Sequence, residues 1–379
     1  MIEKFKEFHK LFKTTKLWLD MEATCENSPW HREANVAIHT QMIIDHYLNT
    51  AASNRTPRQQ AITLLSILFH DTGKPLARTE KNSEKRGKYF SFGGHEQISS
   101  RVFENYVVQH WVKWNKIKEL FELKDTDLYI IQWIIQNHLP HNLSKPEDIQ
   151  RLANHFSHPL WAEDDLRECY FDQCISDQTG RISDNHEANL LEVVEWIDLI
   201  RNCSPEEFYV PEGPTLALLI GASGSGKSTT SNELVANDYR YISLDALRIE
   251  FAASNGVVGG DAVETYKNAF DYCDTHRSMF NRFADVAFDK LLKDYESIVV
   301  DNTNVNRKSR MGYGTKARAG QYKLKAYLFP IERSELLNRA KTRTDKNVPI
   351  TAICDQYARI TMPWLGAEVD EVIIVTSNI

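Results

Sequence analysis

A glycine-rich turn follows an apolar run in the second half of the chain. The run is residues 216–220, and the turn after it fits the pattern G-x-x-x-x-G-K-[ST] without a mismatch. Glycines suit a turn that wraps a triphosphate, because backbone N–H groups must point inward and a Cβ would stand in the way. We expect Lys227 to meet the β- and γ-phosphates, Ser228 to hold Mg²⁺, and a helix that opens at Thr229 to present its positive end. The predicted site comprises Gly221, Ser223, Gly224, Ser225, Gly226, Lys227, Ser228 and Thr229.

Histidines and aspartates that could bind metal ions are spread along the first half. An apolar run that is expected to be helical stops at adjacent His70 and Asp71. An imidazole and a carboxylate can both bind one ion while the other carboxylate oxygen reaches a second ion. A single histidine in a helix is more often a surface or core residue, but an ordered set on several helices could converge on the interior of a bundle. The other members of the set are His39, His95, His138 and Asp177.

Polar residues end two further apolar runs in the second half. Residues 239–245 form a short predicted strand that ends at Asp245, and residues 297–300 form a buried strand followed by Asp301. The carboxyl ends of strands face the ligand crevice in an α/β domain, so Asp245 and Arg248 fall where an acceptor would lie. Asp301 is placed like the acidic residue of a Walker B strand. It either helps to position Mg²⁺ or caps the end of its strand.

These residues need a scaffold in which strands and helices alternate. More strands are predicted at 322–329 and 371–375, and a helix at 334–344 places Arg339 and Arg343 four residues apart on one face. The alternation predicts an α/β domain with a parallel sheet and helices on both faces.

The first half is different in character. Helical periodicity and few β-branched runs predict an all-α domain, in which the charged segment 80–88 is expected to be a mobile loop. Residues 205–213 have the proline, glycine and acidic composition of a linker. We therefore expect a helical domain at 1–204, a linker at 205–213 and an α/β domain at 214–379.

Composition limits the classes of function. The 379 residues carry a net charge of −7, which argues against a protein that coats nucleic acid, although a basic excess in residues 307–346 favours an anionic partner met at one place. The sequence has no run of about 18 apolar residues and, among its six cysteines, no C-x-x-C pair. We expect a cytoplasmic protein with neither a disulfide scaffold nor a zinc ribbon.

The ordered set in the first half resembles the HD phosphohydrolase superfamily. The match covers roughly residues 25–185, and residues 29–40 and 70–75 are similar to the HD domains attached to tRNA nucleotidyltransferases. The resemblance implies one metal ion on His39, His70, Asp71 and Asp177, and a second on His95, His138 and the bridging Asp71. It also implies that Lys74 neutralises the scissile phosphate. His141 is an alternative to His138.

Two such ions would activate a water and clamp a phosphoester. Imidazole-rich sites accept Mn, Co, Ni, Cu or Zn, so the sequence leaves the metal open.

The second half resembles the phage-type polynucleotide 5′-kinases. Four separated motifs over about residues 214–362 carry this likeness: the glycine-rich turn, Asp245-x-x-Arg248, Asp301-Asn302-Thr303-Asn304, and Arg339-x-x-x-Arg343 with residues 348–350 after it. By this resemblance Asp245 is the base that takes the proton of a polynucleotide 5′-hydroxyl, and Arg248 holds the acceptor's phosphate. Arg339 and Arg343 form a lid over the phosphates of ATP.

Together the two halves resemble bacterial and phage end-healing proteins. In those proteins one domain phosphorylates 5′-hydroxyl ends and the other removes 2′,3′-cyclic or 3′-phosphates. The likeness implies RNA or DNA ends as substrates and a nucleic-acid ligase as the next enzyme. Two alternatives stay open: a small-molecule or nucleoside kinase beside a nucleotidase, and an ATP-driven switch whose HD part is only a metal-bound sensor.

Overall fold

The chain consists of two compact units, Met1–Phe208 and Tyr209–Ile379, and the division lies within residues 205–213. The computed structural model describes residues 1–26, 32–83, 87–108, 112–139, 145–183, 185–206, 210–344 and 346–376. Within those ranges, no helix combines the length and the apolar character that a bilayer crossing requires.

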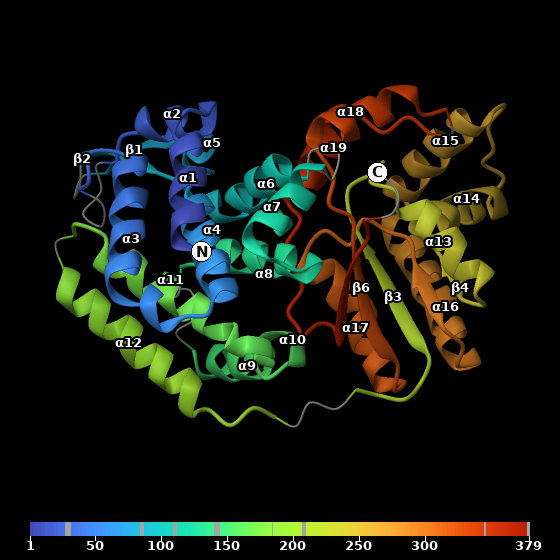
Figure 1. Ribbon diagram of the computed structural model, residues 1–379. Helices are drawn as coiled ribbons and strands as arrows, with labels where there is room; N and C mark the ends of the chain where they lie inside the picture. Colours follow the sequence, from blue (N-terminus) through green and yellow to red (C-terminus); the bar gives the residue numbers. More distant parts are fainter. Residues whose placement is uncertain are drawn as a thin grey trace. The chain divides into compact units, whose positions relative to one another are not determined.

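The first unit is built mainly of helices, as expected (Figure 1). Its longer helices are α1 (Ile2–Phe12), α2 (Lys16–Glu22), α3 (Val36–Thr50), α4 (Pro57–Phe69), α6 (His95–Val107), α7 (Val112–Phe121), α8 (Asp125–Gln136), α9 (Pro146–Phe156), α11 (Arg167–Thr179) and α12 (His186–Asn202). Its short helical turns are η1 (Ala52–Asn54), α5 (Lys74–Ala77), α10 (Pro159–Ala162) and η3 (Glu163–Asp165).

Helix α4 lies at the centre of this unit. It starts cleanly because Thr56 and Gln59 form a capping box and Pro57 occupies its first position. From Ala61 onward every residue of the helix is buried. A helix without a polar face must be surrounded by other elements, and α4 packs against α3, α6, α8 and α11. The histidine and aspartate at its carboxyl end are therefore deep inside the unit.

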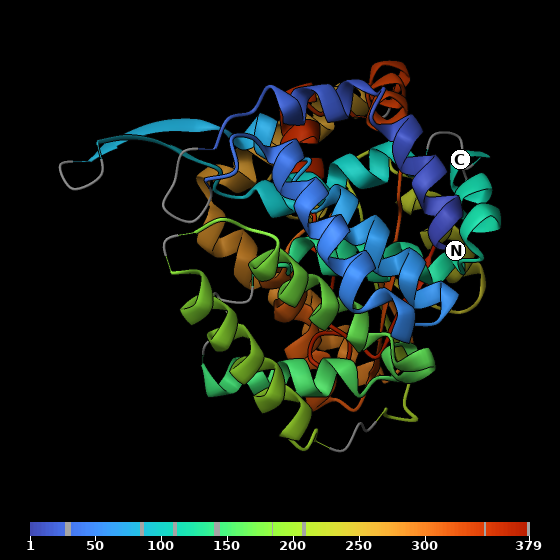
Figure 2. The ribbon, with the colours of Figure 1, turned by 60° about the vertical axis from the view of Figure 1, so that its left-hand side comes forward.

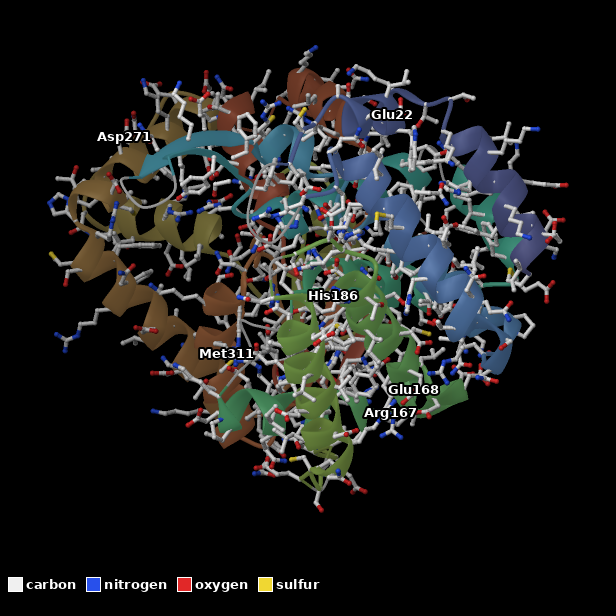
Figure 3. All side chains as sticks on the ribbon, turned by 90° about the vertical axis from the view of Figure 1, so that its left-hand side faces the viewer. Glu22, Arg167, Glu168, His186, Asp271 and Met311 are labelled. Atoms are coloured by element: carbon white, nitrogen blue, oxygen red, sulfur yellow. The ribbon has the colours of Figure 1, made fainter. Side chains whose placement is uncertain are left out.

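Charged side chains fix α11 to its neighbours. Glu168, labelled in Figure 3, accepts hydrogen bonds from Arg55 at 2.9 Å and from Arg201 of α12 at 2.8 Å. Arg55 also binds Asp172, one turn further along α11, at 2.6 Å. These contacts hold the helix that carries Asp177.

The charged segment expected to be a mobile loop is instead part of a β-hairpin. Strands β1 (Thr79–Ser83) and β2 (Gly87–Ser91) pair antiparallel, with Thr79 opposite Ser91. Figure 2 shows the hairpin reaching out from the helices of its unit. Strand β1 has no apolar residue and β2 has only the adjacent Tyr89 and Phe90, so the hairpin carries no alternation of apolar residues that would reveal it in the sequence. The hairpin is also the exception to the expected all-α composition.

The second unit contains the parallel sheet that the sequence predicts. The strands are β3 (Thr215–Ile220), β4 (Arg240–Ile242), β5 (Ile298–Val300), β6 (Lys323–Leu328) and β7 (Glu371–Ile374), in the order β4-β5-β3-β6-β7. Every neighbouring pair is parallel. The helices are α13 (Lys227–Ala236), α14 (Leu244–Ser254), α15 (Ala262–Thr275), α16 (Arg277–Asp294), α17 (Arg307–Ala319), α18 (Arg333–Thr342) and α19 (Ile350–Ala358).

Strand β3 is the middle of this sheet. Its residues from Leu216 onward are buried, and Ala217 and Leu219 pack with Val299 of β5 and Phe329 in one core cluster. Strands buried on both faces read as continuous apolar runs, which is why β3 and β5 were predictable. Because the strands are parallel, the residues that follow β3, β4 and β5 gather at one edge of the sheet.

Candidate nucleotide site and metal centre

The glycine-rich turn after β3 has the backbone geometry that its composition predicts. Gly224 and Gly226 have φ of +92° and +100°, in the left-handed region that favours glycine. A Cβ at Gly221 would stand 2.3 Å from Oγ of Ser225. Helix α13 begins at Lys227, two residues before the expected Thr229, which is exposed in its first turn. The helix starts earlier because the left-handed Gly226 already serves as its N-cap.

Lys227 and Ser228 lie where the motif requires them. Nζ of Lys227 donates to the carbonyls of Gly221 at 2.9 Å and Ala222 at 2.8 Å, and burial lowers its pKa to about 8. Oγ of Ser228 donates to Oδ2 of Asp301 at 3.2 Å. Hydroxyl and carboxylate oxygens are ligands that Mg²⁺ accepts. The structure thus places Asp301 beside Ser228, the residue expected to hold Mg²⁺.

Residues of helices α18 and α19 lie next to the glycine-rich turn. The N–H of Ser223 donates to Oε1 of Gln356 at 2.9 Å. A Cβ at Gly224 would lie 3.9 Å from Cβ of Arg339. Gln356 had no sequence signal, because one glutamine in an amphipathic helix does not stand out.

Asp245 differs from its predicted setting. Strand β4 ends at Ile242, and Asp245 lies in the first turn of α14, after the N-cap Ser243. Its Oδ1 accepts a hydrogen bond from Nη1 of Arg248 at 2.7 Å, and its Oδ2 contacts Nζ of Lys346 at 2.5 Å. The sequence placed Asp245 with Arg248 but missed Lys346, which is 101 residues away along the chain.

The groups around Asp245 belong to the same site as the glycine-rich turn. The charges of Asp245, Asp301, Arg343 and Lys346 all act on the buried Lys227. Tyr266 of α15 places its hydroxyl 3.5 Å from Oδ1 of Asp245. The site therefore combines a carboxylate, several cations and the phosphate-binding turn.

The expectation that Arg339 and Arg343 share a helix face is wrong. Helix α18 ends at Thr342, and Arg343 follows in an extended conformation, with φ −71° and ψ 133°. Two β-branched threonines flank Arg343 and disfavour another helical turn. Arg339 is on the helix, where its Nε donates to Glu335 at 2.7 Å. Arg343 lines a pocket of about 430 Å³ together with Lys341 and Lys346.

Several bases of the segment 307–346 pair with acids from elsewhere in the unit. Arg310 pairs with Glu368 at 2.8 Å, Lys316 with Asp289 at 2.9 Å and Arg318 with Asp370 at 2.9 Å. For these three residues the basic excess is a property of the sequence window, because their acids lie outside it.

The candidate metal ligands of the first unit converge from different elements. His39 is on α3, His70 and Asp71 follow α4, His95 opens α6 and Asp177 is on α11. His138 was expected in a helix but lies just after the end of α8. All six are buried. The alternative ligand His141 lies outside the described residues.

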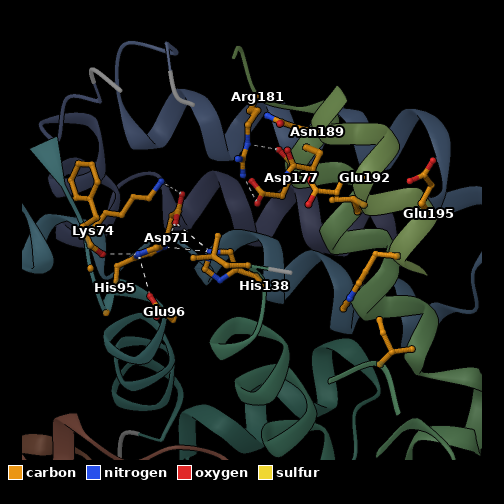
Figure 4. Close-up of a pocket in the computed structure, with 18 of the residues that line it drawn as sticks. Asp71, Lys74, His95, Glu96, His138, Asp177, Arg181, Asn189, Glu192 and Glu195 are labelled. Atoms are coloured by element: carbon orange, nitrogen blue, oxygen red, sulfur yellow. Dashed lines mark hydrogen bonds and ion pairs between the residues drawn. The ribbon is translucent and has the colours of Figure 1, made fainter. Parts of the chain in front are cut away.

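The two oxygens of Asp71 face different histidines. Oδ1 lies 3.1 Å from Nε2 of His95 and 3.8 Å from Nε2 of His138. Oδ2 lies 3.1 Å from Nε2 of His70 and 3.6 Å from Nε2 of His39. His39 is in turn 3.1 Å from Oδ1 of Asp177. Asp71 therefore stands between two groups of side chains, as a ligand shared by two ions would. Figure 4 shows Asp71 with His95 and His138, the members of one group.

Backbone carbonyls orient three of these imidazoles. Nδ1 of His70 contacts the carbonyl of Ile67 at 2.7 Å, Nδ1 of His95 that of Phe92 at 2.8 Å, and Nδ1 of His138 that of Ile135 at 2.7 Å. Because a carbonyl oxygen can only accept, this contact puts a proton on Nδ1, and Nε2 points toward Asp71. Metal-binding histidines are commonly held in this way.

The residues fit a metal centre. Two overlapping sets of three side chains each have ligand atoms close enough together to hold one ion. One set is His39, His70 and Asp177, and the other is His70, Asp71 and His138. Nε2 of His70, both oxygens of Asp71 and Oδ1 of Asp177 are buried but make no hydrogen bond of normal geometry with any described residue. Buried polar atoms without such bonds are costly. An ion coordinated by these atoms would remove that cost.

Charge compensation keeps the two carboxylates ionised. Burial alone would raise the pKa of Asp71, but the charges of His70 and Lys74 hold it well below its ordinary value. Burial acts in the same direction on Asp177, but Arg181 and His39 hold its pKa well below the ordinary value. Ionised carboxylates are the form that binds cations.

Three charged residues near the centre were not predicted. Glu26 accepts a hydrogen bond from Lys74 at 2.6 Å, and Lys74 also pairs with Asp71 at 2.7 Å. Glu33 lies 3.6 Å from Nδ1 of His39, and Arg181 binds Asp177 at 2.7 Å. The sequence predicted Lys74 at this centre, and Arg181 had a signal only in its spacing of four residues from Asp177.

The comparisons bear on the second unit. Residues 216–363 match a family model described as AAA domain. Among solved structures, a gluconokinase from Sinorhizobium meliloti 1021 is similar at 20% identity and a TM-score of 0.29, over 43% of this chain and 84% of that chain. No curated protein matches the chain.

Residues 216–363 form a P-loop domain built on a parallel sheet. A P-loop implies a nucleoside triphosphate with Mg²⁺. The family match does not extend to the helical unit.

Proposed function

We propose that this chain heals the ends of broken nucleic acids with two activities. The second unit transfers the γ-phosphate of ATP to the 5′-hydroxyl end of RNA or DNA. The first unit hydrolyses 3′-phosphate or 2′,3′-cyclic phosphate ends in a metal-dependent reaction. The products of both activities are the ends that a nucleic-acid ligase joins.

Asp245 carries the kinase part of the proposal. Its carboxylate lies in the electrostatic reach of Lys227 and is paired with Arg248. Asp245 takes the proton of the 5′-hydroxyl as the hydroxyl oxygen bonds to the γ-phosphorus, and the bond to the bridging oxygen of ADP breaks. Arg248 holds a phosphate of the acceptor, and Arg339 and Arg343 bring positive charge to the transferred phosphoryl group.

Ser228 and Asp301 would hold Mg²⁺, which neutralises charge on the phosphates when bound. The turn itself orients the triphosphate through its N–H groups. In the structure Asp245 is also held by Lys346. An acceptor hydroxyl must therefore reach a carboxylate that two cations already bind.

The six buried ligands carry the hydrolase part. Two divalent metals would be held by His39, His70, Asp71 and Asp177 on one side and by His95, His138 and Asp71 on the other. Bound metals supply an activated water and charge neutralisation. Lys74 and Arg181 line the same cleft as Asp71 and place positive charge beside the phosphate to be cleaved.

The kinase activity is tested by transfer of labelled γ-phosphate from ATP to a 5′-hydroxyl oligonucleotide. Removing a general base typically costs a factor of roughly 10²–10⁴ in rate, and we expect Asp245→Ala to fall in this range. Asp274→Ala, at an exposed position of the same unit, is the matched control and should retain full activity. Full transfer by Asp245→Ala would refute the assignment, and faster transfer to free nucleosides would favour a nucleoside kinase.

The hydrolase activity is tested by phosphate release from a 3′-phosphate RNA with Mn²⁺, Co²⁺, Ni²⁺, Cu²⁺ or Zn²⁺. Asp71→Ala should abolish release, because it removes the ligand shared by both metal groups, and it should leave the kinase rate unchanged. Asp45→Ala, an exposed aspartate of α3, should change neither rate. Slow ATP hydrolysis without an acceptor and no release with any metal would instead support the switch hypothesis.

A further inference from the structure

The metal centre opens into a cleft much larger than one phosphate needs. The cleft has a volume of about 1280 Å³, and Asp71, His95, His138 and Asp177 line one part of it. Sites that enclose a whole small-molecule ligand are typically about 300–1,000 Å³. Helix α12 and strand β2 line the remainder. A phosphate at the metal centre would leave this remainder for the group to which the phosphate is attached.

Apolar and aromatic side chains form much of that remainder, and we name it the side arm. They are Tyr89, Phe90 and Phe92 near the hairpin, Ile149 of α9, and Trp196 and Leu199 of α12. Two of the rings pack against residues that do not line the cleft. Trp196 lies 6.0 Å from the ring of Tyr170, and the guanidinium of Arg78 lies 3.7 Å from the ring of Phe90. Aromatic rings that are held in place by such contacts suit the stacking of a flat ligand group.

The charge of the side arm excludes another phosphate. Its charged residues are Glu192 and Glu195, which Figure 4 shows on α12, across the cleft from Asp71 and His95. A third carboxylate of the cleft, Glu96, lies beside His95, with Oε2 3.3 Å from Nδ1. Lys74 and Arg181 are the cleft's lysine and arginine among the described residues, and both pair with carboxylates of the metal centre. A phosphate in the side arm would meet these carboxylates, and none of the described residues that line the side arm is a lysine or arginine that would offset them.

The polar groups of the side arm match the edge of a nucleobase. Carboxylates accept hydrogen bonds from the amino groups of bases, and carboxamides can donate and accept at once. The carboxamides that line the cleft are Gln150, Gln178, Asn189 and Asn202. A flat, uncharged ring that bears amino groups satisfies both the aromatic faces and the carboxylates.

We infer that the side arm binds the base of the terminal nucleotide, so that the first unit recognises a nucleoside and not only its phosphate. This inference rests on the hydrolase activity proposed above. The terminal phosphate lies at Asp71, the base lies between α12 and β2, and Leu199 with Glu192 and Glu195 determines which bases are accepted.

The test compares two oligonucleotides that end in the same 3′-phosphate, one with a normal last nucleotide and one whose last sugar has no base. The wild-type chain should cleave the normal end with a KM roughly 5- to 100-fold lower, the range given by stacking of one base. Leu199→Ala should raise the KM for the normal end about 3- to 10-fold, as expected for one lost apolar contact. It should leave kcat, and the KM for the baseless end, unchanged.

Helix α12 offers a matched control. Leu191 is 58% exposed and Leu199 is 60% exposed, but only Leu199 lines the cleft. Leu191→Ala should therefore change neither KM. A second variant, Glu192→Gln with Glu195→Gln, should alter the preference among the four terminal bases and leave the baseless end unaffected.

The outcomes separate this inference from the proposed function. Equal KM values for the normal and the baseless end, or equal effects of Leu199→Ala on both, would overturn the inference while leaving the hydrolase intact. If neither end is cleaved with any of the five metals, the proposed hydrolase activity itself fails.

Discussion

Asp71 contacts more of the candidate metal ligands than a single histidine partner would require. It contributes one oxygen to each of two groups of histidines, and its Oδ2 also pairs with Lys74 at 2.7 Å. No other carboxylate among the described residues of the site reaches both groups. Substitution of Asp71 removes a carboxylate oxygen from both groups at once. Its effect should therefore be larger than the loss of a ligand from one group.

His9 allows a pH prediction away from both sites. It is 7% exposed on α1, and its ring stacks on Phe5 at 5.7 Å and meets Trp18 at 5.2 Å. Burial, with a smaller effect from the charge of Lys13, lowers the pKa of His9 from its ordinary 6.5 to about 4. Between these values the unfolded chain binds more protons than the folded chain. The free energy of unfolding should therefore fall as the pH drops from 6.5 to 4.

Over this pH range His9 contributes at most about 3 kcal/mol to the change in the free energy of unfolding, from 1.36 kcal/mol for each pKa unit. His9→Leu removes the titrating group, and we expect its first-unit transition to vary less with pH over this range. Urea unfolding of both proteins at pH 4.5, 5.5, 6.5 and 7.5 measures the difference. Parallel curves would show that His9 is not the group responsible.

At the scale of elements, the turn between α4 and α5 packs against the start of α6 and sets the distance between Asp71 and His95. A Cβ at Gly73 would stand 2.3 Å from the carbonyl oxygen of His95 and 2.6 Å from the N–H nitrogen of Ser99. The N–H of Gly73 donates to Oγ of Ser99 at 2.8 Å. This close approach of two backbones leaves no room for a side chain.

We expect Gly73→Ala to force the turn away from α6. Overpacking of this kind costs about 1–3 kcal/mol, and misplacement of a supporting group lowers metal affinity about 10–100-fold. Denaturant unfolding and calorimetric titration with Mn²⁺ measure the two effects. Gly93→Ala is the control, because a Cβ at Gly93 meets nothing within 4 Å and its backbone is not strained. Wild-type metal affinity in Gly73→Ala would contradict the role of the turn.

Elements were predictable where their apolar pattern is strong, and less so elsewhere. Strands β3 and β5 were expected because continuous apolar runs mark buried strands. The hairpin was missed because its strands carry no alternation of apolar residues. The end of α18 was missed because Arg339 and Arg343 have helical spacing. In the structure the helix ends at Thr342, and the chain leaves it at Arg343 before α19 begins after Pro349.

Contacts between distant parts of the chain set the limit for the sites. The histidines and aspartates of the metal centre could be listed from the sequence because their types and order are informative. Lys346, Tyr266 and Gln356 could not, because their significance comes only from the residues that they meet in the fold. The distances around Asp71 depend on the packing of several helices and have no sequence signal.

At the scale of the whole molecule, two units with separate cores should respond separately to ligands. We expect ATP with Mg²⁺ to bind the second unit, and at 100 times its Kd it should stabilise that unit by about 2.7 kcal/mol. For a unit of this size the shift in Tm is roughly 5–11 °C. Mn²⁺ alone should raise the transition of the first unit, and a chelator should reverse that shift.

Calorimetry of the full chain with each ligand in turn measures both transitions. The variants Asp71→Ala and Lys227→Ala identify them, since each should abolish one ligand's shift and leave the other. A single transition that both ligands move would show that the chain unfolds as one cooperative block.

The hydrogen bonds of Lys227 and Ser223 have a thermodynamic consequence. Lys227 binds two carbonyls of its own loop, and Ser223 donates to Gln356. A triphosphate that recruits these groups exchanges existing hydrogen bonds for new ones, so that each contact contributes only the difference between the two. Nucleotide affinity should therefore be more modest than the number of contacts suggests. The released Gln356 and loop carbonyls would give α18 and α19 a means to register whether nucleotide is bound.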